Sequence, residues 1–431
     1  MPWLFLALSV WGGLFTAAAR YPAKKNKILF VPTFFMSWLT IELAAHHLVL
    51  QMFTVGLFVW GGALDAWPGW VALGICLVSW VALIGMVLQG RASALTMREA
   101  LADLVPGDDD GPKVPLRQKV LPFAMGRRDV QVVRNIVFAQ VAGKRLKLDV
   151  YRPRQMPRRL LPAVLQIHGG AWVIGDKREQ GIPLLTHLAA NGWVGFNANY
   201  RLSPGATFPD HLVDLKRAVA WIREHGREHG ADPDELVVTG GSAGGHLTAL
   251  MALTANDPRY QLGFPDVDTS FRAAVPFYGV YDFTNRLASS DPVFLRRFLE
   301  PYVMKAFFEE EPEKFAEASP VDRVHAGAPP FLVIHGDRDT LAPLADARLF
   351  VERLRAISAQ PVLYAELAGS QHAFDVFPSI RSVHVIEGVE RFLRAVRKGT
   401  MPDDPAKAEQ HVDQKTDTTP DVEEAVESMA D

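Results

Sequence analysis

The fold is decided at residues 237–246, which read Val-Val-Thr-Gly-Gly-Ser-Ala-Gly-Gly-His. A β-branched run typical of a strand ends in a Gly-x-Ser-x-Gly pattern at Gly240, Ser242 and Gly244, and a helix-like stretch follows. A serine on so sharp a turn has strained backbone angles, and its hydroxyl stands clear of the sheet at a helix N-terminus, where free N–H groups favour negative charge. The pattern predicts that Ser242 is a nucleophile. A tight glycine-rich turn without chemistry is the alternative.

From residue 130 onward the chain alternates between strand-like and helix-like runs. Strand-like runs cover 132–137, 146–151, 163–167, 193–197, 236–239, 273–277, 331–334 and 362–366. Helix-like runs cover 178–191, 210–229, 243–255, 344–357 and 380–397. This alternation predicts an α/β fold, a mainly parallel sheet covered by helices on both faces.

The interval 283–328 breaks this rhythm. Phe294, Phe298 and Tyr302 recur in it at helical spacing, and further aromatic residues follow at 307 and 308. We expect a helical insertion over the carboxyl edge of the sheet, where it would be a candidate lid. Ordinary helix packing explains the aromatic residues equally well.

A serine nucleophile needs a base and a third group that orients the base. In this topology the acid and then the histidine each follow a strand. The loop after 331–334 contains Asp339 and the loop after 362–366 contains His372, so we assign Asp339 as the acid and His372 as the base.

Each assignment has a neighbouring alternative. Asp337 is the alternative acid, although the first aspartate after a strand commonly holds a turn together through backbone N–H groups. His335 is the alternative base, and its place at the very end of a strand favours a role in stabilising the loop.

The stretch after strand 163–167 reads His168, Gly169, Gly170, Ala171, Trp172. Adjacent glycines allow backbone N–H groups to point into a cavity without side chains in the way. We expect the N–H groups of Gly169, Gly170 and Ala243 to form an oxyanion hole. His168 is expected to hold this loop.

Four segments carry a resemblance to a known family: 168–172, 199–204, 240–246, and 335–343 taken with His372. Together they resemble the α/β-hydrolase superfamily, specifically the hormone-sensitive-lipase-like and related carboxylesterases, over residues 130–397. Two positions depart from the pattern, because Gly241 stands where many members have Asp and Ala171 where many have a third Gly. Both features look closer to the esterase and formamidase branches. The resemblance implies the same triad and oxyanion donors.

The first hundred residues are different in character and predict a membrane-anchoring helical region, 1–100. Apolar runs at 3–19, 46–64 and 69–89 are expected to span a bilayer, with 28–45 interfacial or re-entrant; four spans is the alternative. A cleavable signal peptide is disfavoured because no basic residue precedes the first run. The loop 20–27 is basic, so the positive-inside rule predicts that it is cytoplasmic, whereas the turn 65–68 has no Lys or Arg and suits the far side. Arg91 and Arg98 then return to the cytoplasm, which predicts a cytoplasmic catalytic domain.

Ionisable residues within this apolar region also need an explanation. Glu42 and His46 are four residues apart and would share one helix face. We expect Glu42 and His46 to form an interfacial hydrogen-bonded pair, and as metal ligands they lack a third partner. A functional site within the membrane is the alternative, because ionisable groups there, His47 included, are functional candidates.

The remaining segments and the overall composition limit the function. Residues 101–129 are rich in Pro, Gly and Asp and predict a linker; 130–398 is the catalytic domain. The tail 399–431 is expected to be disordered, because from 401 it holds ten acidic and two basic residues and no aromatic ones. A net charge of −3 without a basic stripe argues against nucleic-acid binding. The single cysteine, Cys76, allows no intrachain disulfide and suggests no thiol metal site.

With the apolar region added, the chain resembles the membrane-anchored Lip-type carboxylesterases of mycobacteria and relatives. This resemblance implies a membrane-anchored serine carboxylesterase or lipase that acts on ester or lipid-like small molecules through an acyl-enzyme, with no metal or organic cofactor. An amidase or formamidase on the same triad is one alternative, and a non-catalytic membrane-bound binding module is another. The sequence does not give the oligomeric state.

Overall fold

A single eight-stranded sheet forms the centre of the α/β part of the chain in the computed structural model, which describes residues 1–22, 30–105, 111–290 and 295–398. The strand order is β1-β2-β4-β3-β5-β6-β7-β8. The pairs β1–β2 and β2–β4 are antiparallel and the others are parallel. The strands are β1 Val130–Val141, β2 Lys144–Pro153, β3 Leu161–Ile167, β4 Val194–Ala198, β5 Ala231–Gly241, β6 Ala274–Phe277, β7 Phe331–Gly336 and β8 Val362–Leu367. The prediction of a mainly parallel α/β sheet is therefore confirmed.

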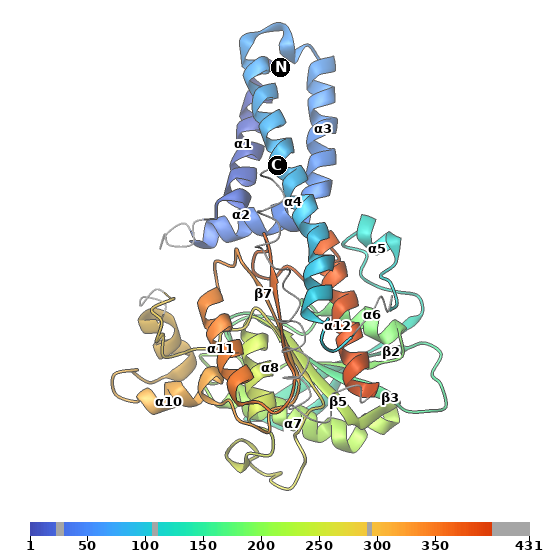
Figure 1. The fold of residues 1–431 in the computed structure, drawn as a ribbon, viewed down its shortest axis with the longest axis vertical. Coiled ribbons are helices and arrows are strands. Elements are labelled where there is room, and N and C mark those ends of the chain that lie inside the picture. The colour runs from blue at the N-terminus through green and yellow to red at the C-terminus, as the bar shows by residue number, and fades with distance from the viewer. Residues whose placement is uncertain (23–29, 106–110, 291–294, 399–431) are drawn as a thin grey trace, which may run out of the picture.

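The sheet is covered on both faces because its strands alternate their buried side chains. Val164 and Val237 pack into one core and their neighbours Leu165 and Val238 into the other. One face is covered by α7 Asp210–His225, α8 Ala243–Leu253 and α11 Leu344–Ile357. The other is covered by α6 Ile182–Ala190 and α12 Ile380–Lys398 (Figure 1). Each apolar side chain removed from water in this way contributes roughly 1.5–3 kcal/mol.

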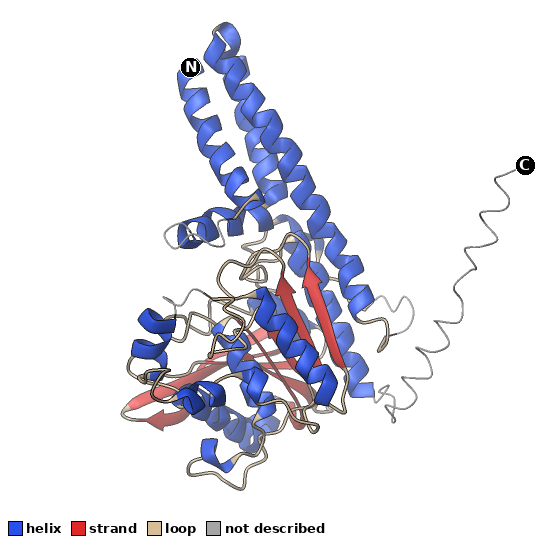
Figure 2. Cartoon of the chain, turned by 60° about the vertical axis from the view of Figure 1, so that its left-hand side comes forward, coloured by secondary structure: helices blue, strands red, loops and turns tan. Residues whose placement is uncertain are grey.

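The N-terminal region forms a helical bundle that projects from the α/β part. Its helices are α1 Pro2–Arg20, α2 Phe30–Glu42, α3 Ala44–Trp60 and α4 Trp67–Ala100, with the short η1 Ala63–Asp65 between α3 and α4. Helices α1, α3 and α4 run side by side, and α2 lies across the base of the bundle (Figures 1 and 2). By length and composition α1 and α4 are candidate membrane spans; α2 and α3 meet at 86° and qualify together as one broken span or re-entrant loop.

Helix α4 is longer than expected. The apolar run predicted a span over 69–89, but the helix continues to Ala100. Its last turns carry Met97, which enters the core under α12 together with Leu101. The helix is therefore shared between the bundle and the α/β part, and the segment expected to be a linker begins only after it.

The expected pairing of Glu42 with His46 is wrong. The helix breaks at Leu43, between α2 and α3, so the two side chains do not share one helical face. Glu42 instead pairs with Arg381 of α12, and His46 Nε2 hydrogen-bonds to the backbone oxygen of Val120, at the end of α5 Leu116–Val120.

The interval 283–328 contains η4 Leu295–Met304, α10 Pro312–Glu317 and η5 Pro320–Asp322. Phe298 and Phe308 pack against the main core, and a lid role for this segment stays a prediction.

Several sequence-based expectations lie outside the described residues: Phe294, the lysines at 24, 25 and 27, and the acidic tail 399–431. The short η2 Gly226–His229 and η3 Pro258–Tyr260 complete the elements.

Candidate active site

Ser242 occupies the turn between β5 and α8. Its backbone angles are φ +60° and ψ −123°, a region that a residue with a side chain rarely adopts. The Ser242 N–H donates to the backbone oxygen of Phe277 at 3.0 Å, which fixes the turn against the end of β6. The strained turn predicted from the Gly-x-Ser-x-Gly pattern is thus present in the structure.

The glycine at 241 has a steric cause. A Cβ atom there would lie 2.5 Å from Oη of Tyr278, a residue that directly follows β6. No side chain fits in this space unless the tyrosine moves.

Asp339 and His372 lie together in the loops that follow β7 and β8. The Nδ1–H group of His372 donates to Oδ2 of Asp339 at 2.7 Å, and Oδ1 accepts from the N–H groups of Leu341 and Ala342 at 2.8 Å each. Burial disfavours the charged form of Asp339, but the neighbouring His372 and its hydrogen bond hold the pKa of this carboxyl below its ordinary value. With the proton on Nδ1, the lone pair of Nε2 is available as a base.

The two neighbouring residues hold the loops instead. Oδ1 of Asp337 accepts from the N–H of Gly369 at 2.7 Å and so joins the two loops. His335 Nε2 hydrogen-bonds to the backbone oxygen of Ala342 at 3.2 Å and lies 3.5 Å from Oδ2 of Asp339. These contacts agree with the structural roles expected for both.

Tyr278 lies against His372 and close to Gly241, the residue before the nucleophile. Within the described residues the Ser242 hydroxyl makes no hydrogen bond to His372, and such bonds are often long before substrate binds. The Tyr278 ring lies 4.6 Å from the His372 ring between centroids, and its hydroxyl donates to Oδ1 of Asp375. Burial, followed by the charge of Asp375, raises the pKa of Tyr278 well above its usual range. Sequence analysis missed this residue, although its place directly after a strand was a usable signal.

The loop 168–172 lies beside the nucleophile. A Cβ atom built on Gly169 would be 3.0 Å from Cβ of Ser242. The Gly169 N–H donates to Oε1 of Gln180 at 2.7 Å, whereas the N–H groups of Gly170 and Ala243 have no acceptor among the described residues. Gln180 was not foreseen, and no pattern in the sequence marks it. The oxyanion roles of Gly169, Gly170 and Ala243 all stay predictions, and in this structure the N–H of Gly169 already donates to Gln180.

The backbone of this loop is strained and is fastened by aromatic residues. Ala171 and Trp172 follow Gly170 with φ of +50° and +62°. Trp172 Nε1 donates to Nδ1 of His246 at 3.2 Å, and burial lowers the pKa of His246 to about 3, so this imidazole accepts as a neutral ring.

His168 fastens the same loop from the side of β4. Its ring stacks on Tyr200 with 4.5 Å between centroids, and the tyrosine hydroxyl donates to the backbone oxygen of His168 at 3.1 Å. His168 therefore has the loop-holding role expected from the sequence.

No group of three or more His, Cys, Asp or Glu side chains that could hold a metal ion is found in the described ranges.

Comparison with known proteins indicates the family of the chain. The family described as BD-FAE matches residues 148–354. Two proteins of Mycobacterium tuberculosis are similar: the probable carboxylic ester hydrolase LipM is 49% identical over 59% of each chain, and the esterase LipC is 40% identical over 69% of this chain and 74% of its own. A thermophilic esterase from Thermogutta terrifontis, solved with butyrate bound, matches 64% of this chain and 97% of its own at 25% identity and a TM-score of 0.53.

The similarity covers only part of some of these relatives. The matched segment spans 59% of LipM and 63% of the M. tuberculosis esterase LipQ. Their names therefore describe proteins that extend beyond the matched region. The match to LipC, together with the sheet order and the strained serine turn, shows that the chain belongs to the α/β-hydrolase carboxylesterase family that includes the mycobacterial Lip esterases.

Proposed function

We propose that this protein is a serine carboxylic-ester hydrolase in which Ser242, His372 and Asp339 form the catalytic triad. The observation that carries the proposal is the buried 2.7 Å hydrogen bond between His372 Nδ1 and Asp339, and it is supported by the φ of +60° at Ser242 in the turn after β5. The histidine is held in the tautomer that a general base requires, and the serine is held on the turn that a nucleophile requires.

In the acylation step, Nε2 of His372 takes the proton of the Ser242 hydroxyl as Oγ attacks the ester carbonyl. The carbonyl oxygen becomes an oxyanion, and the free N–H groups of Gly170 and Ala243 donate to it. His372 then returns the proton to the departing alcohol, and an ester bond joins the acyl group to Ser242. Asp339 stabilises the charged imidazolium in between.

In the deacylation step, Nε2 of His372 takes a proton from water, and the resulting hydroxide attacks the acyl-enzyme. The bond to Ser242 breaks, the proton returns to Oγ, and the carboxylic acid leaves. Every proton is exchanged through one nitrogen, so the reaction requires no group beyond the side chains and N–H groups of this chain.

The solubilised full-length protein is expected to hydrolyse p-nitrophenyl esters. The rate of hydrolysis of matched p-nitroanilides is expected to be lower by about 100-fold or more. The difference arises because the amine must be protonated by His372 as it leaves, whereas p-nitrophenolate leaves without help. Absorbance assays with both substrate types measure this directly. Faster turnover of the anilides would favour an amidase or formamidase, and no turnover of either would favour a binding module.

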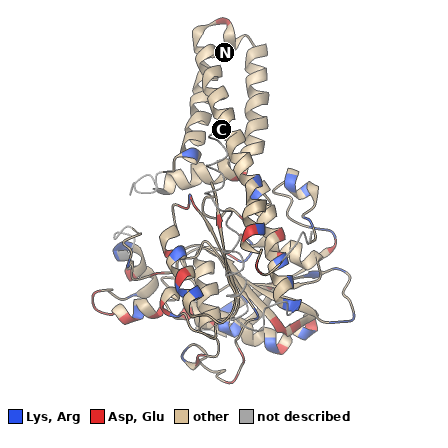
Figure 3. Ribbon diagram, in the orientation of Figure 1, with Lys and Arg blue, Asp and Glu red and all other residues tan. Residues whose placement is uncertain are grey.

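We further propose that the N-terminal bundle anchors the protein in a bilayer through α1, α3 and α4, with α2 at the interface. Figure 3 shows that the bundle carries almost no charged residues between its ends. Helix α1 has 19 residues, about 28 Å at 1.5 Å per residue, against a hydrocarbon core of about 30 Å. At the tip, Trp3, Trp60, Trp67 and Trp70 are 61–89% exposed, and tryptophan is enriched where membrane and water meet.

The positive-inside rule places the α/β part in the cytoplasm, and introduced cysteines test this orientation. In a Cys76→Ala background, which removes the sole cysteine, a membrane-impermeant maleimide is expected to label Ala66→Cys at the tip in intact cells. Glu224→Cys, at a side chain 77% exposed on α7, is expected to react only after permeabilisation. The reverse pattern would place the α/β part outside. Labelling of both positions in intact cells would contradict a membrane-spanning anchor.

A further inference from the structure

The buried amide of Gln371 joins helix α2 to both loops of the triad. Its Oε1 accepts from the N–H of Thr340 at 2.8 Å and from the N–H of His372 at 2.9 Å. Two backbone N–H groups point at the same atom of the Gln371 amide, so this atom must be the acceptor oxygen. The NH₂ group, Nε2, therefore faces Ser37. Nε2 donates to Ser37 Oγ at 3.0 Å, and the Ser37 hydroxyl donates to the backbone oxygen of Phe34 at 3.1 Å.

Two aromatic residues of α2 contact the next residues of the same loop. Trp38 Nε1 donates to the backbone oxygen of Ala373 at 2.8 Å, and the Phe34 ring stands edge-on to the His372 ring with 6.2 Å between centroids. Ala373 has φ +58°, a strained conformation for a residue with a side chain, which persists only where the surroundings impose it. The loop therefore depends on α2 for its backbone conformation.

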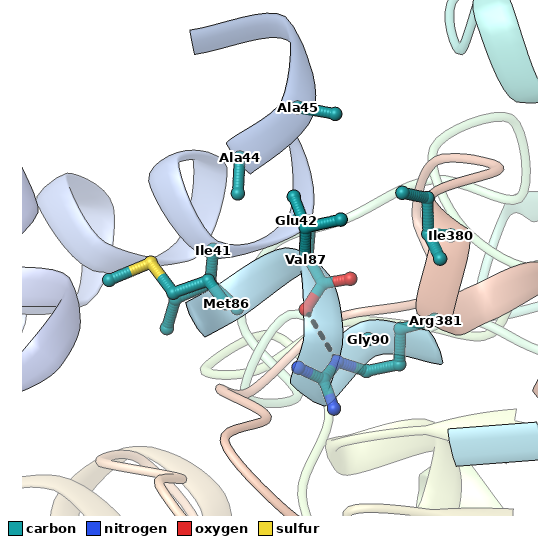
Figure 4. A pocket seen from close by; sticks show the side chains of 9 residues that line it. All are labelled: Ile41, Glu42, Ala44, Ala45, Met86, Val87, Gly90, Ile380 and Arg381. Atoms are coloured by element: carbon teal, nitrogen blue, oxygen red, sulfur yellow. Dashed lines mark hydrogen bonds and ion pairs between the residues drawn. The ribbon is translucent and has the colours of Figure 1, made fainter. Parts of the chain in front are cut away.

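Helix α2 is itself fastened to the α/β part. At its end, Glu42 accepts from Ser379 Oγ at 2.6 Å. It also accepts from Arg381 Nε at 3.1 Å (Figure 4). Arg381 also donates to the backbone oxygens of Ala368 and Gly369, at the start of the loop that carries His372. Arg381 thus holds the start of the loop, at residues 368 and 369, and α2 contacts the three residues 371–373.

We propose that α2 is a positioning element of the active site, in which Ser37 and Trp38 hold the loop so that Nε2 of His372 faces Ser242. The inference rests on the esterase function proposed above. It assigns the N-terminal helical region a part in catalysis that is separate from attachment to a bilayer. Among the described residues, neither Ser37 nor Trp38 hydrogen-bonds to the side chain of Ser242, His372 or Asp339, so both would act through Gln371 and Ala373.

The test compares Ser37→Ala with Thr40→Ala in the solubilised full-length protein. Both hydroxyls are buried on α2, but that of Thr40 bonds only to Met36 of its own helix, at 2.7 Å. We expect Ser37→Ala to lower kcat for a p-nitrophenyl ester about tenfold, since small misplacements of a catalytic group are costly, and to change KM less than twofold. Labelling of Ser242 by a fluorophosphonate should slow by the same factor, while Thr40→Ala stays at the wild-type rate and both variants melt at the same temperature.

A kcat for Ser37→Ala equal to that of Thr40→Ala, or a change confined to KM or to the melting temperature, would overturn the proposal. Trp38→Phe is the second variant if Ser37→Ala does not fold. It keeps an aromatic ring but removes the bond to Ala373, so the same loss of kcat is expected, and an unchanged kcat counts against the proposal. A wild-type protein that neither hydrolyses the ester nor takes the label would instead refute the esterase function itself.

Discussion

Ser242→Ala is expected to lower kcat for ester hydrolysis by about 10⁵-fold or more, because loss of a triad nucleophile leaves only the residual catalysis of the oxyanion donors and substrate binding. The protein should remain folded. The wild-type Ser242 side chain has no hydrogen-bond partner among the described residues, and alanine fits the same turn.

The measurement is steady-state hydrolysis of a p-nitrophenyl ester beside fluorophosphonate labelling and a thermal melt. Ser270→Ala is the matched control, because its hydroxyl bonds only to Asp268 in an exposed turn, at 3.0 Å. The control should keep full activity and labelling. Substantial hydrolysis or labelling in Ser242→Ala would show that another residue is the nucleophile.

Asp339→Asn is expected to lower kcat by about 10⁴-fold through the tautomer of His372. The N–H groups of Leu341 and Ala342 both donate to one oxygen of the side chain, so the amide oxygen of an asparagine must take that place. Its NH₂ group then faces Nδ1 of His372, which has to become the acceptor. The ring proton moves to Nε2, and the base that would deprotonate Ser242 is lost.

Asp337→Asn is the control for this second substitution, since the amide oxygen can still accept from the N–H of Gly369. Its kcat should stay within a few-fold of wild type, and binding of substrate should change little in either variant. If Asp337→Asn had the larger effect, the acid of the triad would have been assigned to the wrong aspartate.

Local patterns predicted the strands and the positions that follow them. Ser242, Asp339 and His372 could be proposed because each lies in the turn or loop that follows a buried run, and parallel strands bring such loops to one edge. Tyr278 also follows a buried strand and could have been placed at the same edge of the sheet. It was not proposed as a site residue because a tyrosine is neither a nucleophile nor a base at neutral pH.

Other features depend on contacts that no local pattern contains. Ser37 and Gln371 are separated by 334 positions, so their hydrogen bond follows from how the bundle docks on the sheet. Glu42 was paired with His46 because helical periodicity was assumed to continue through Leu43, where the chain turns by 86°. Gln180 is an ordinary polar residue in a loop, and only the folded structure shows its bond to Gly169.

Because α4 is one continuous helix, it fixes the orientation of the α/β part relative to the bundle. Its 34 residues make a rod of about 51 Å that begins at the tip and ends inside the core. An α-helix turns by about 100° per residue. One residue inserted in the middle of α4 would therefore rotate the α/β part about the helix axis by about 100° relative to the bundle. An insertion of seven residues, about two full turns, would nearly restore the original orientation. An insertion in α4 that departs from a whole number of helical turns is therefore expected to separate α2 from the histidine loop, where Ser37 and Trp38 make their hydrogen bonds.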